Sequence, residues 1–196
     1  CTTHVIIQDN MGVCTNNPPL IANVDGMVTD EMGFTVENVT VSVNDGVTNP
    51  IVTSGSGTFE FEDLIIGNDY TVSPEKDMNY LNGVTTYDLV LLRKHILHIS
   101  YLDSPYKLIA ADVNKSGTVT VSDMVEMRKL VLFVEDEFSN NTSWRFVKSD
   151  YVFLNPDDPF MFGFPELRSL NDLNDDMMTG DFVAIKIGDL NGSAQT

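Results

Sequence analysis

The feature that most constrains this chain is an internal repeat near its middle. The segments DMNYLNGVTTYDLVLLRKHIL (residues 77–97) and DVNKSGTVTVSDMVEMRKLVL (residues 112–132) align at an offset of 35 residues. Each opens with a polar stretch and continues with apolar residues at i, i+3 and i+7, the pattern of an amphipathic helix. The repeat therefore predicts two loop-plus-helix units of one design. Their predicted core positions are Leu89, Leu92 and Ile96 in the first helix and Met124, Met127 and Val131 in the second.

The second copy has the ligand spacing of an EF-hand-type calcium loop. Residues 112–123 carry oxygen-bearing side chains at the first, third, fifth, ninth and twelfth places, with Gly117 at the sixth. A calcium ion needs several oxygens at about 2.3–2.6 Å, and alternate residues of a tight loop supply them. A polar turn that only caps the helix is the alternative. The predicted ligands are the side chains of Asp112, Asn114 and Ser116, the Thr118 carbonyl, Thr120 (directly or through water) and Asp123.

The first copy departs from this spacing. Its fifth place is Leu81, which has no ligand atom, and its sixth is Asn82, which adopts positive φ less easily than glycine. We therefore expect a weaker or water-completed first site, and the second loop to be filled more readily. With two carboxylates per loop, the expected calcium affinity is that of extracellular modules, on the order of 10⁻⁴ M or somewhat tighter. The predicted ligands of the first loop are Asp77, Asn79, the Gly83 carbonyl, Thr85 and Asp88.

The repeat resembles the dockerin type I module of cellulosome-related and other secreted bacterial proteins. Both loops end in Asp, at Asp88 and Asp123, and an Arg-Lys pair recurs at residues 93–94 and 128–129. The resemblance implies two calcium loops, each followed by one helix, packed as a pseudo-symmetric pair. It also implies that the repeated helix positions contact a cohesin partner. Ordinary solvated charge is the alternative for the Arg-Lys pairs.

Residues 21–75 predict a small β-sandwich. Apolar and polar residues alternate in NVTVSV (residues 38–43) and GTFEFE (residues 57–62), and turn residues separate the short strands. GMVTDEMGFTVENVTVSV and SGSGTFEFEDLIIGNDYTVSPEK resemble the B-type repeats of Gram-positive surface proteins and the carboxypeptidase-regulatory-like fold. That resemblance implies a fold and no chemistry. The whole arrangement resembles modules near the C-termini of large secreted or surface proteins of Bacteroidetes-type bacteria.

The segment of residues 1–20 reads as a short strand and a linker. It holds both cysteines of the chain, Cys1 and Cys14. Two cysteines without a third ligand nearby favour a disulfide, and hence an oxidising, extracellular setting. Pairing of Cys1 with an upstream cysteine and a lipidated N-terminus are the alternatives.

The extension of residues 136–196 predicts two strands, at 144–147 and within 181–192, that pair with each other against the helices. Between them lies a long loop rich in Pro, Gly and acidic residues. Asp189-Leu190-Asn191-Gly192 resembles the opening of a further calcium loop. The remaining ligands do not follow it, which favours a simple Asn-Gly turn.

The predicted organisation is α+β, with several regions. Residues 1–20 form a strand and linker, 21–75 a small β-sandwich, 76–135 a paired EF-hand-like (dockerin-like) calcium module, and 136–196 a partly β extension packed on that module. A formal charge of −18 argues against nucleic-acid and anionic-membrane partners. The sequence holds no apolar run long enough for membrane insertion. G-x-S-x-G, HExxH and comparable catalytic patterns are also missing, so no enzymatic activity is expected.

These features lead to two functional hypotheses. The first is a non-catalytic structural or adhesion module, secreted or at the cell surface, stabilised by calcium and part of a large surface protein or filament. The alternative is a dockerin anchor that binds cohesin and recruits its chain to a scaffold. The expected partner is a protein in both cases, either a further copy of the chain or a cohesin-like domain.

Overall fold

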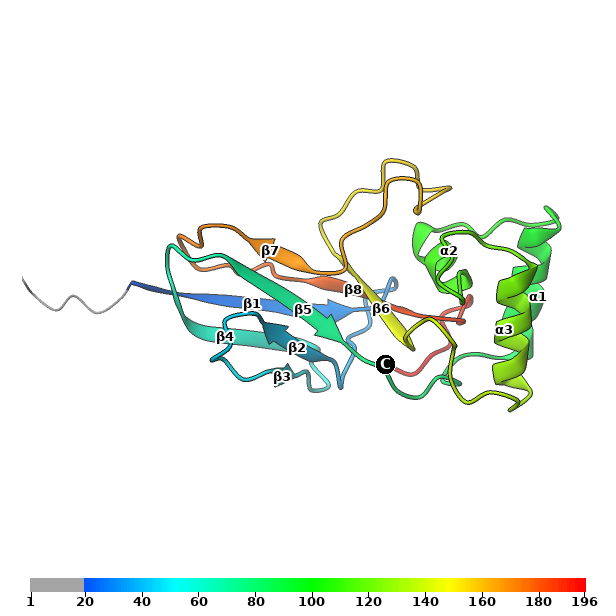
Figure 1. Cartoon of the computed structure of the whole chain (residues 1–196), viewed down its shortest axis with the longest axis horizontal. Coiled ribbons are helices and arrows are strands. Elements are labelled where there is room, and N and C mark those ends of the chain that lie inside the picture. The colour runs from blue at the N-terminus through cyan, green and yellow to red at the C-terminus, as the bar shows by residue number, and fades with distance from the viewer. Residues whose placement is uncertain (1–19) are drawn as a thin grey trace, which may run out of the picture.

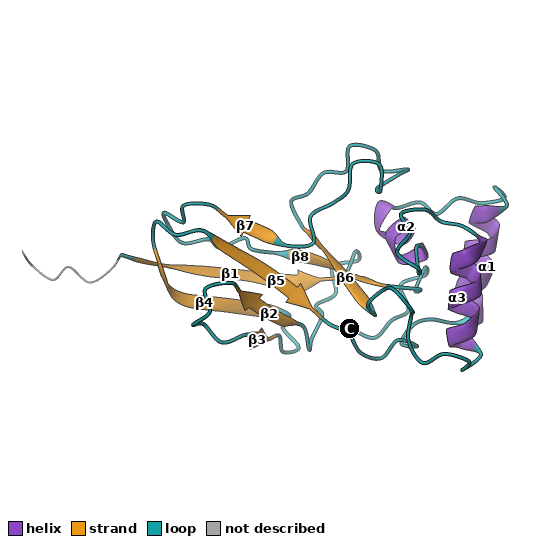
Figure 2. Cartoon of the chain, viewed as in Figure 1, coloured by secondary structure: helices purple, strands orange, loops and turns teal. Residues whose placement is uncertain are grey.

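The computed structural model describes residues 20–196, which form two regions, one of strands and one of helices (Figures 1 and 2). The predicted N-terminal strand and the Cys1–Cys14 disulfide lie outside the described residues. The elements, in chain order, are β1 (Ile21–Thr29), β2 (Thr40–Val43), β3 (Ile51–Val52), β4 (Thr58–Ile65), β5 (Tyr70–Glu75), α1 (Thr86–Ile96), α2 (Pro105–Ala111), α3 (Val121–Val131), β6 (Trp144–Lys148), β7 (Arg168–Leu170) and β8 (Phe182–Lys186).

The strands form two four-stranded sheets, with the orders β4-β1-β8-β6 and β3-β2-β5-β7. Alternation sets which side of each strand is buried. In β4, Phe59 and Phe61 are buried while Glu60 and Glu62 are exposed. Both sheets contribute to one hydrophobic core, which includes Val24, Val41, Phe61, Val72 and Phe182. We call this part, residues 20–75 and 144–187, the sheet region.

Strands from the C-terminal extension enter both sheets. β8 runs parallel to β1, with Val28 opposite Phe182, and β7 runs antiparallel to β5, with Tyr70 opposite Leu170. The predicted pairing of the two extension strands is present as β6 with β8, which run antiparallel. This pair contacts the helices, as expected, through Val147, Ile185 and Ile187. Its strands also complete the sheets, which was not expected, because alternation shows which face of a strand is buried and leaves its partner strand undetermined.

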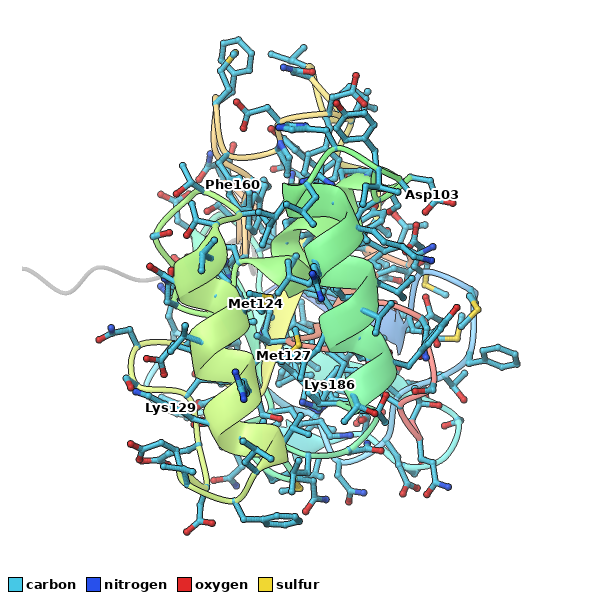
Figure 3. All side chains as sticks on the ribbon, turned by 90° about the vertical axis from the view of Figure 1, so that its right-hand side faces the viewer. Asp103, Met124, Met127, Lys129, Phe160 and Lys186 are labelled. Carbon is cyan, nitrogen blue, oxygen red and sulfur yellow. The ribbon has the colours of Figure 1, made fainter. Side chains whose placement is uncertain are left out.

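The helical region, residues 76–143, is thus inserted between β5 and β6. Helices α1 and α3 pack side by side, with Met124 and Met127 between them (Figure 3). Leu92 and Met127 are fully buried, which confirms them as core positions. The other predicted core residues, Leu89, Ile96, Met124 and Val131, are partly buried against the same cluster.

Each helix of the pair begins with a capping box. Thr85 caps α1 with Asp88 at its third position, and Thr120 caps α3 with Asp123. The short α2 begins at Pro105, whose fixed φ suits the first helical position, after the cap Ser104. No helix in the described part of the chain is both long and apolar enough to cross a membrane.

Candidate metal centre

The second loop is held at both ends by helices. Asp112 is the C-cap of α2, and Thr120 is the N-cap of α3. Between them, Lys115 and Gly117 have positive φ angles of 57° and 78°, which turn the chain back on itself. The two helices therefore fix the ends of the loop, and the two residues with positive φ fix the turn between them.

Hydrogen bonds gather the predicted ligands of this loop around its two carboxylates. Asp112 Oδ1 accepts from the Ser116 amide and Asp112 Oδ2 from the Gly117 amide, each at 2.8 Å. Asp123 Oδ1 accepts from the Asn114 amide at 3.1 Å, and Asp123 Oδ2 from the Thr120 amide at 2.8 Å. The Ser116 hydroxyl donates to the Thr118 carbonyl at 3.1 Å. Asp112 and Asp123, at the first and twelfth places, therefore both accept hydrogen bonds from the backbone of the loop between them.

The two carboxylates of this loop are buried close to each other. Asp112 is 1% exposed and Asp123 is fully buried. Burial raises the pKa of Asp123, and the neighbouring Asp112 carboxylate acts in the same direction, against the hydrogen bonds from Thr120 and Asn114. Within residues 20–196, neither carboxylate forms an ion pair with Lys, Arg or His. Two buried acids without a countercharge are costly, and a bound cation would offset that cost.

The chemistry of the donors fits a hard cation. No group of three or more His, Cys, Asp or Glu side chains converges anywhere in the described residues. The second loop instead combines two carboxylates with amide, hydroxyl and carbonyl oxygens. Such all-oxygen sets suit calcium, while zinc and copper prefer nitrogen and sulfur ligands. The residues present therefore fit a calcium ion.

The first loop repeats the second in only one of its halves. Asp88 Oδ2 accepts from the Thr85 amide at 2.8 Å and from its hydroxyl at 2.7 Å, as Asp123 does from Thr120. In the other half, Asp77 Oδ1 accepts from the Ser143 amide, just before β6, at 2.8 Å. Leu81 packs against the helical core. Of the predicted ligands, Gly83, Thr85 and Asp88 lie together, whereas Asp77 is engaged with Ser143 and the Asn79 carbonyl accepts from the Asn82 amide.

The C-terminal segment, residues 188–196, lies on the first loop. The Leu190 amide donates to Asp88 Oδ1 at 2.9 Å, and the Ser193 hydroxyl donates to the Gly83 carbonyl at 3.1 Å. The Asn82 side chain exchanges two hydrogen bonds with the backbone of Gln195. Sequence reasoning missed this contact. The one indication in the sequence was that Asp189-Leu190-Asn191-Gly192 resembles the start of a calcium loop, and this does not show which part of the chain the segment contacts.

Gly83 permits this close approach. Its φ is +75°, and a Cβ at this position would lie 2.6 Å from the Ala194 nitrogen and 2.7 Å from Asp189 Oδ2. Asp189 is 7% exposed. Burial raises its pKa, and the nearby Asp88 carboxylate adds to that rise.

A buried lysine borders this second group of acids. Lys186 Nζ donates to the Tyr80 carbonyl at 2.8 Å and to the Ile187 carbonyl at 3.1 Å. Burial lowers the pKa of Lys186 to about 7, with Asp189 and Asp77 opposing that shift. The ammonium group is therefore close enough to these carboxylates to feel their charge, although its hydrogen bonds go to carbonyl oxygens.

The loops and helices together match a known protein family. Residues 75–132 match the dockerin type I domain. The dockerin match begins at the end of β5 and ends just after α3, so the sheet region and the C-terminal segment lie outside it. Type I dockerins bind calcium, are non-catalytic modules, and occur in secreted or cell-surface proteins. No curated protein matches the chain.

Proposed function

We propose that this chain is a calcium-stabilised, non-catalytic docking unit of an extracellular or cell-surface assembly, and that its partner is a cohesin-type domain. The observation that carries the proposal is the second loop, which lies within the dockerin match. Its two carboxylates are buried, form no ion pair within residues 20–196 and lie among further oxygen-bearing residues. Calcium would be held there by Asp112, Asn114, Ser116, the Thr118 carbonyl, Thr120 and Asp123.

The bound ion would act on the helices through the loop. A bound calcium ion would supply the positive charge that Asp112 and Asp123 lack. Asp123 is both a predicted ligand and the third residue of the α3 capping box. Fixing its carboxylate therefore fixes the start of α3. The pairing of α1 with α3 then presents one defined surface.

The proposed docking surface is the outer side of the helix pair, which we call the paired helix face. It carries exposed apolar residues that recur at the offset of the internal repeat. Arg93, Lys94 and Arg128 add positive charge to it, in a chain of net charge −18, while Lys129 is paired with Glu126 at 3.1 Å. Exposed apolar area beside charge is typical of a protein–protein interface. The recurring apolar pairs are Val90 with Val125 on the helices, and Leu97 with Leu132 and Ile99 with Val134 just after the helix ends, each residue at least 45% exposed.

The docking proposal is tested by titrating the full chain with a panel of cohesin-type domains in an isothermal calorimeter. We expect 1:1 binding in calcium and its loss in excess chelator. The double variant Val90→Asp/Val125→Asp should abolish binding, because it places two charges in the apolar surface. Val47→Asp is the matched control, since Val47 is 86% exposed but lies in the sheet region. A double variant that binds as tightly as the wild type would rule out the paired helix face.

A structural role for the sheet region is a second candidate, supported by the insertion. Because two chain crossings join the sheet and helical regions, the sheet region would serve as a rigid spacer beside the docking unit. The resemblance of residues 21–75 to B-type repeats, and of the arrangement to Bacteroidetes-type surface proteins, is part of this proposal. Light scattering with and without calcium tests it: end-to-end copies or polymers would favour a filament or adhesion role over docking to cohesin.

A further inference from the structure

The C-terminal segment forms the same turn around Asp189 that the second loop forms around Asp112. Asp189 Oδ1 accepts from the Ser193 amide at 3.2 Å, and Asp189 Oδ2 accepts from the Ala194 amide at 2.7 Å. Asp112 makes the equivalent two bonds, to the amides four and five residues ahead. The residue three positions ahead has positive φ in both turns, 70° at Gly192 and 57° at Lys115. Residues 189–194 therefore have the shape of the first half of a calcium loop.

The second half is supplied by the first loop, about 100 residues earlier in the chain. The Ser193 hydroxyl donates to the Gly83 carbonyl at 3.1 Å, as the Ser116 hydroxyl donates to the Thr118 carbonyl at 3.1 Å. After Gly83, the chain passes through Thr85 to Asp88 as the second loop passes from Thr118 through Thr120 to Asp123. The two halves thus meet between Ser193, at the fifth place, and Gly83, at the seventh. In the second loop the same places, Ser116 and Thr118, belong to one continuous stretch of chain.

The side chains match place by place. The second loop reads Asp, Asn, Ser, a carbonyl, Thr and Asp. The two halves together read Asp189, Asn191, Ser193, the Gly83 carbonyl, Thr85 and Asp88. The hydroxyl missing at Leu81 is thereby supplied by Ser193. The hydrogen bonds differ in several respects. Asp88 Oδ1 accepts from the second-place amide of Leu190, while Asp123 Oδ1 accepts from the third-place amide of Asn114. Asp189 Oδ1 also accepts from the Asn191 and Gly192 amides, and Asn114 Oδ1 also accepts from the Ser116 amide.

Burial gives an independent reason to place a cation here. Asp88 is fully buried and Asp189 is 7% exposed, and neither forms an ion pair within the described part of the chain. Asp88 Oδ1 and Asp189 Oδ2 each accept one hydrogen bond. Since a carboxylate oxygen has two lone pairs, each of these oxygens retains one for a metal ion. Two buried acids brought together in this way need a positive charge between them.

We propose that the chain holds a second divalent cation in a split loop, whose first half is Asp189–Ala194 and whose second half is Gly83–Asp88. The ligands are Asp189, Asn191, Ser193, the Gly83 carbonyl, Thr85 and Asp88. Asp189 and Asn191 take the first and third places instead of Asp77 and Asn79, since Asp77 Oδ1 accepts from the Ser143 amide, before β6, and not from the turn of its own loop. This inference rests on the proposed calcium function. It adds that the C-terminal segment, outside the dockerin match, completes the first site.

Counting calcium ions tests the split loop. The full chain is stripped with chelator and titrated with calcium alone in an isothermal calorimeter. The wild type should bind two ions, Asp189→Asn and Asp112→Asn one each, and the double variant Asp112→Asn/Asp189→Asn none. Asp77→Asn is the matched control and should still bind two. Ser193→Ala is a milder change at the split loop and should weaken one site while the other keeps its wild-type affinity. Circular dichroism confirms that each variant is folded.

The outcomes separate this inference from the proposed function. Loss of one ion in Asp77→Asn, with two retained in Asp189→Asn, would assign the first site to the continuous loop and overturn the split loop. A wild type that binds one ion, lost in Asp112→Asn and unaffected by Asp189→Asn, would overturn the split loop while calcium binding stands. In that case the Lys186 ammonium is the countercharge for Asp189. A wild type that binds no calcium would overturn both proposals.

Discussion

At the scale of single residues, the second loop brings two buried carboxylates close together. Asp112 and Asp123 are eleven positions apart, and one turn with Gly117 at its centre is enough to bring them together. Their spacing along the chain is therefore sufficient to indicate the site. Asp189 carries the same signal, followed by Asn191 and Ser193, but its other half lies far back in the chain. Spacing can only be read along the chain, so the proposed split loop looks there like a simple turn.

Removing one carboxylate of the second loop should remove its response to calcium. We expect Asp123→Asn and Asp112→Asn to lose the gain that one site provides, roughly 2.7 kcal/mol of unfolding free energy when calcium is about 100-fold above its dissociation constant. Thermal melts of each variant in calcium and in chelator measure this difference. Asp136→Asn, at an exposed position after α3, should behave as the wild type. A wild-type melt unchanged by chelator would refute the calcium role altogether.

At the scale of elements, the helices were predictable because their signals are local. The i, i+3, i+7 pattern, the caps Thr85 and Thr120 and the Ser104-Pro105 start all lie within one or two turns of the helices they specify. The strands at β2, β4 and β5 were predictable for the same reason. The structure of the connection after α1, residues 97–104, could not be predicted from such local signals. There, His95 and His98 both contact Tyr101, and His95 Nδ1 accepts from the Leu102 amide at 3.2 Å.

This connection should respond to pH. Burial lowers the pKa of His95 from its usual 6.5, with His98 acting in the same direction. The folded protein therefore binds fewer protons here than the unfolded chain. The stability that neutral His95 contributes is complete above about pH 6.5 and is lost as the pH falls through the lowered pKa. Denaturation at several pH values should show this loss, and His95→Asn, which keeps an acceptor for the Leu102 amide, should reduce it.

The matched control for the pH prediction is His98→Asn. It keeps His95 and should retain most of the wild-type pH dependence, although it removes one neighbouring charge. Equal pH dependence in the wild type and in His95→Asn would contradict the assignment to His95.

At the scale of the whole molecule, the sheet and helical regions are coupled in three ways. The chain crosses between them after β5 and again before β6, and the C-terminal segment returns to the first loop (Figure 1). The third link could not be predicted, because it joins residues more than 100 positions apart and no local pattern encodes the partner of a loop.

This coupling predicts cooperative unfolding of both regions. Trp144, the single tryptophan, is 2% exposed in the sheet core and reports on the sheet region through its fluorescence. Far-UV ellipticity is dominated by α1, α2 and α3. We expect the two signals to change at the same denaturant concentration, and chelator to shift both by the same amount. Separate transitions, with only the ellipticity responding to chelator, would show that the regions unfold independently.

The parallel pairing of β1 with β8 also orders events during synthesis. About 150 residues separate Thr29 from Phe182, which a ribosome adds in roughly 8–30 s at about 5–20 residues per second. Throughout that interval, the side of β1 that β8 will cover has no strand beside it, while the loops and helices between them are made in full. An open strand edge invites pairing with other chains. The nascent protein must therefore avoid aggregation through the unpaired edge of β1 until β8 has been synthesised.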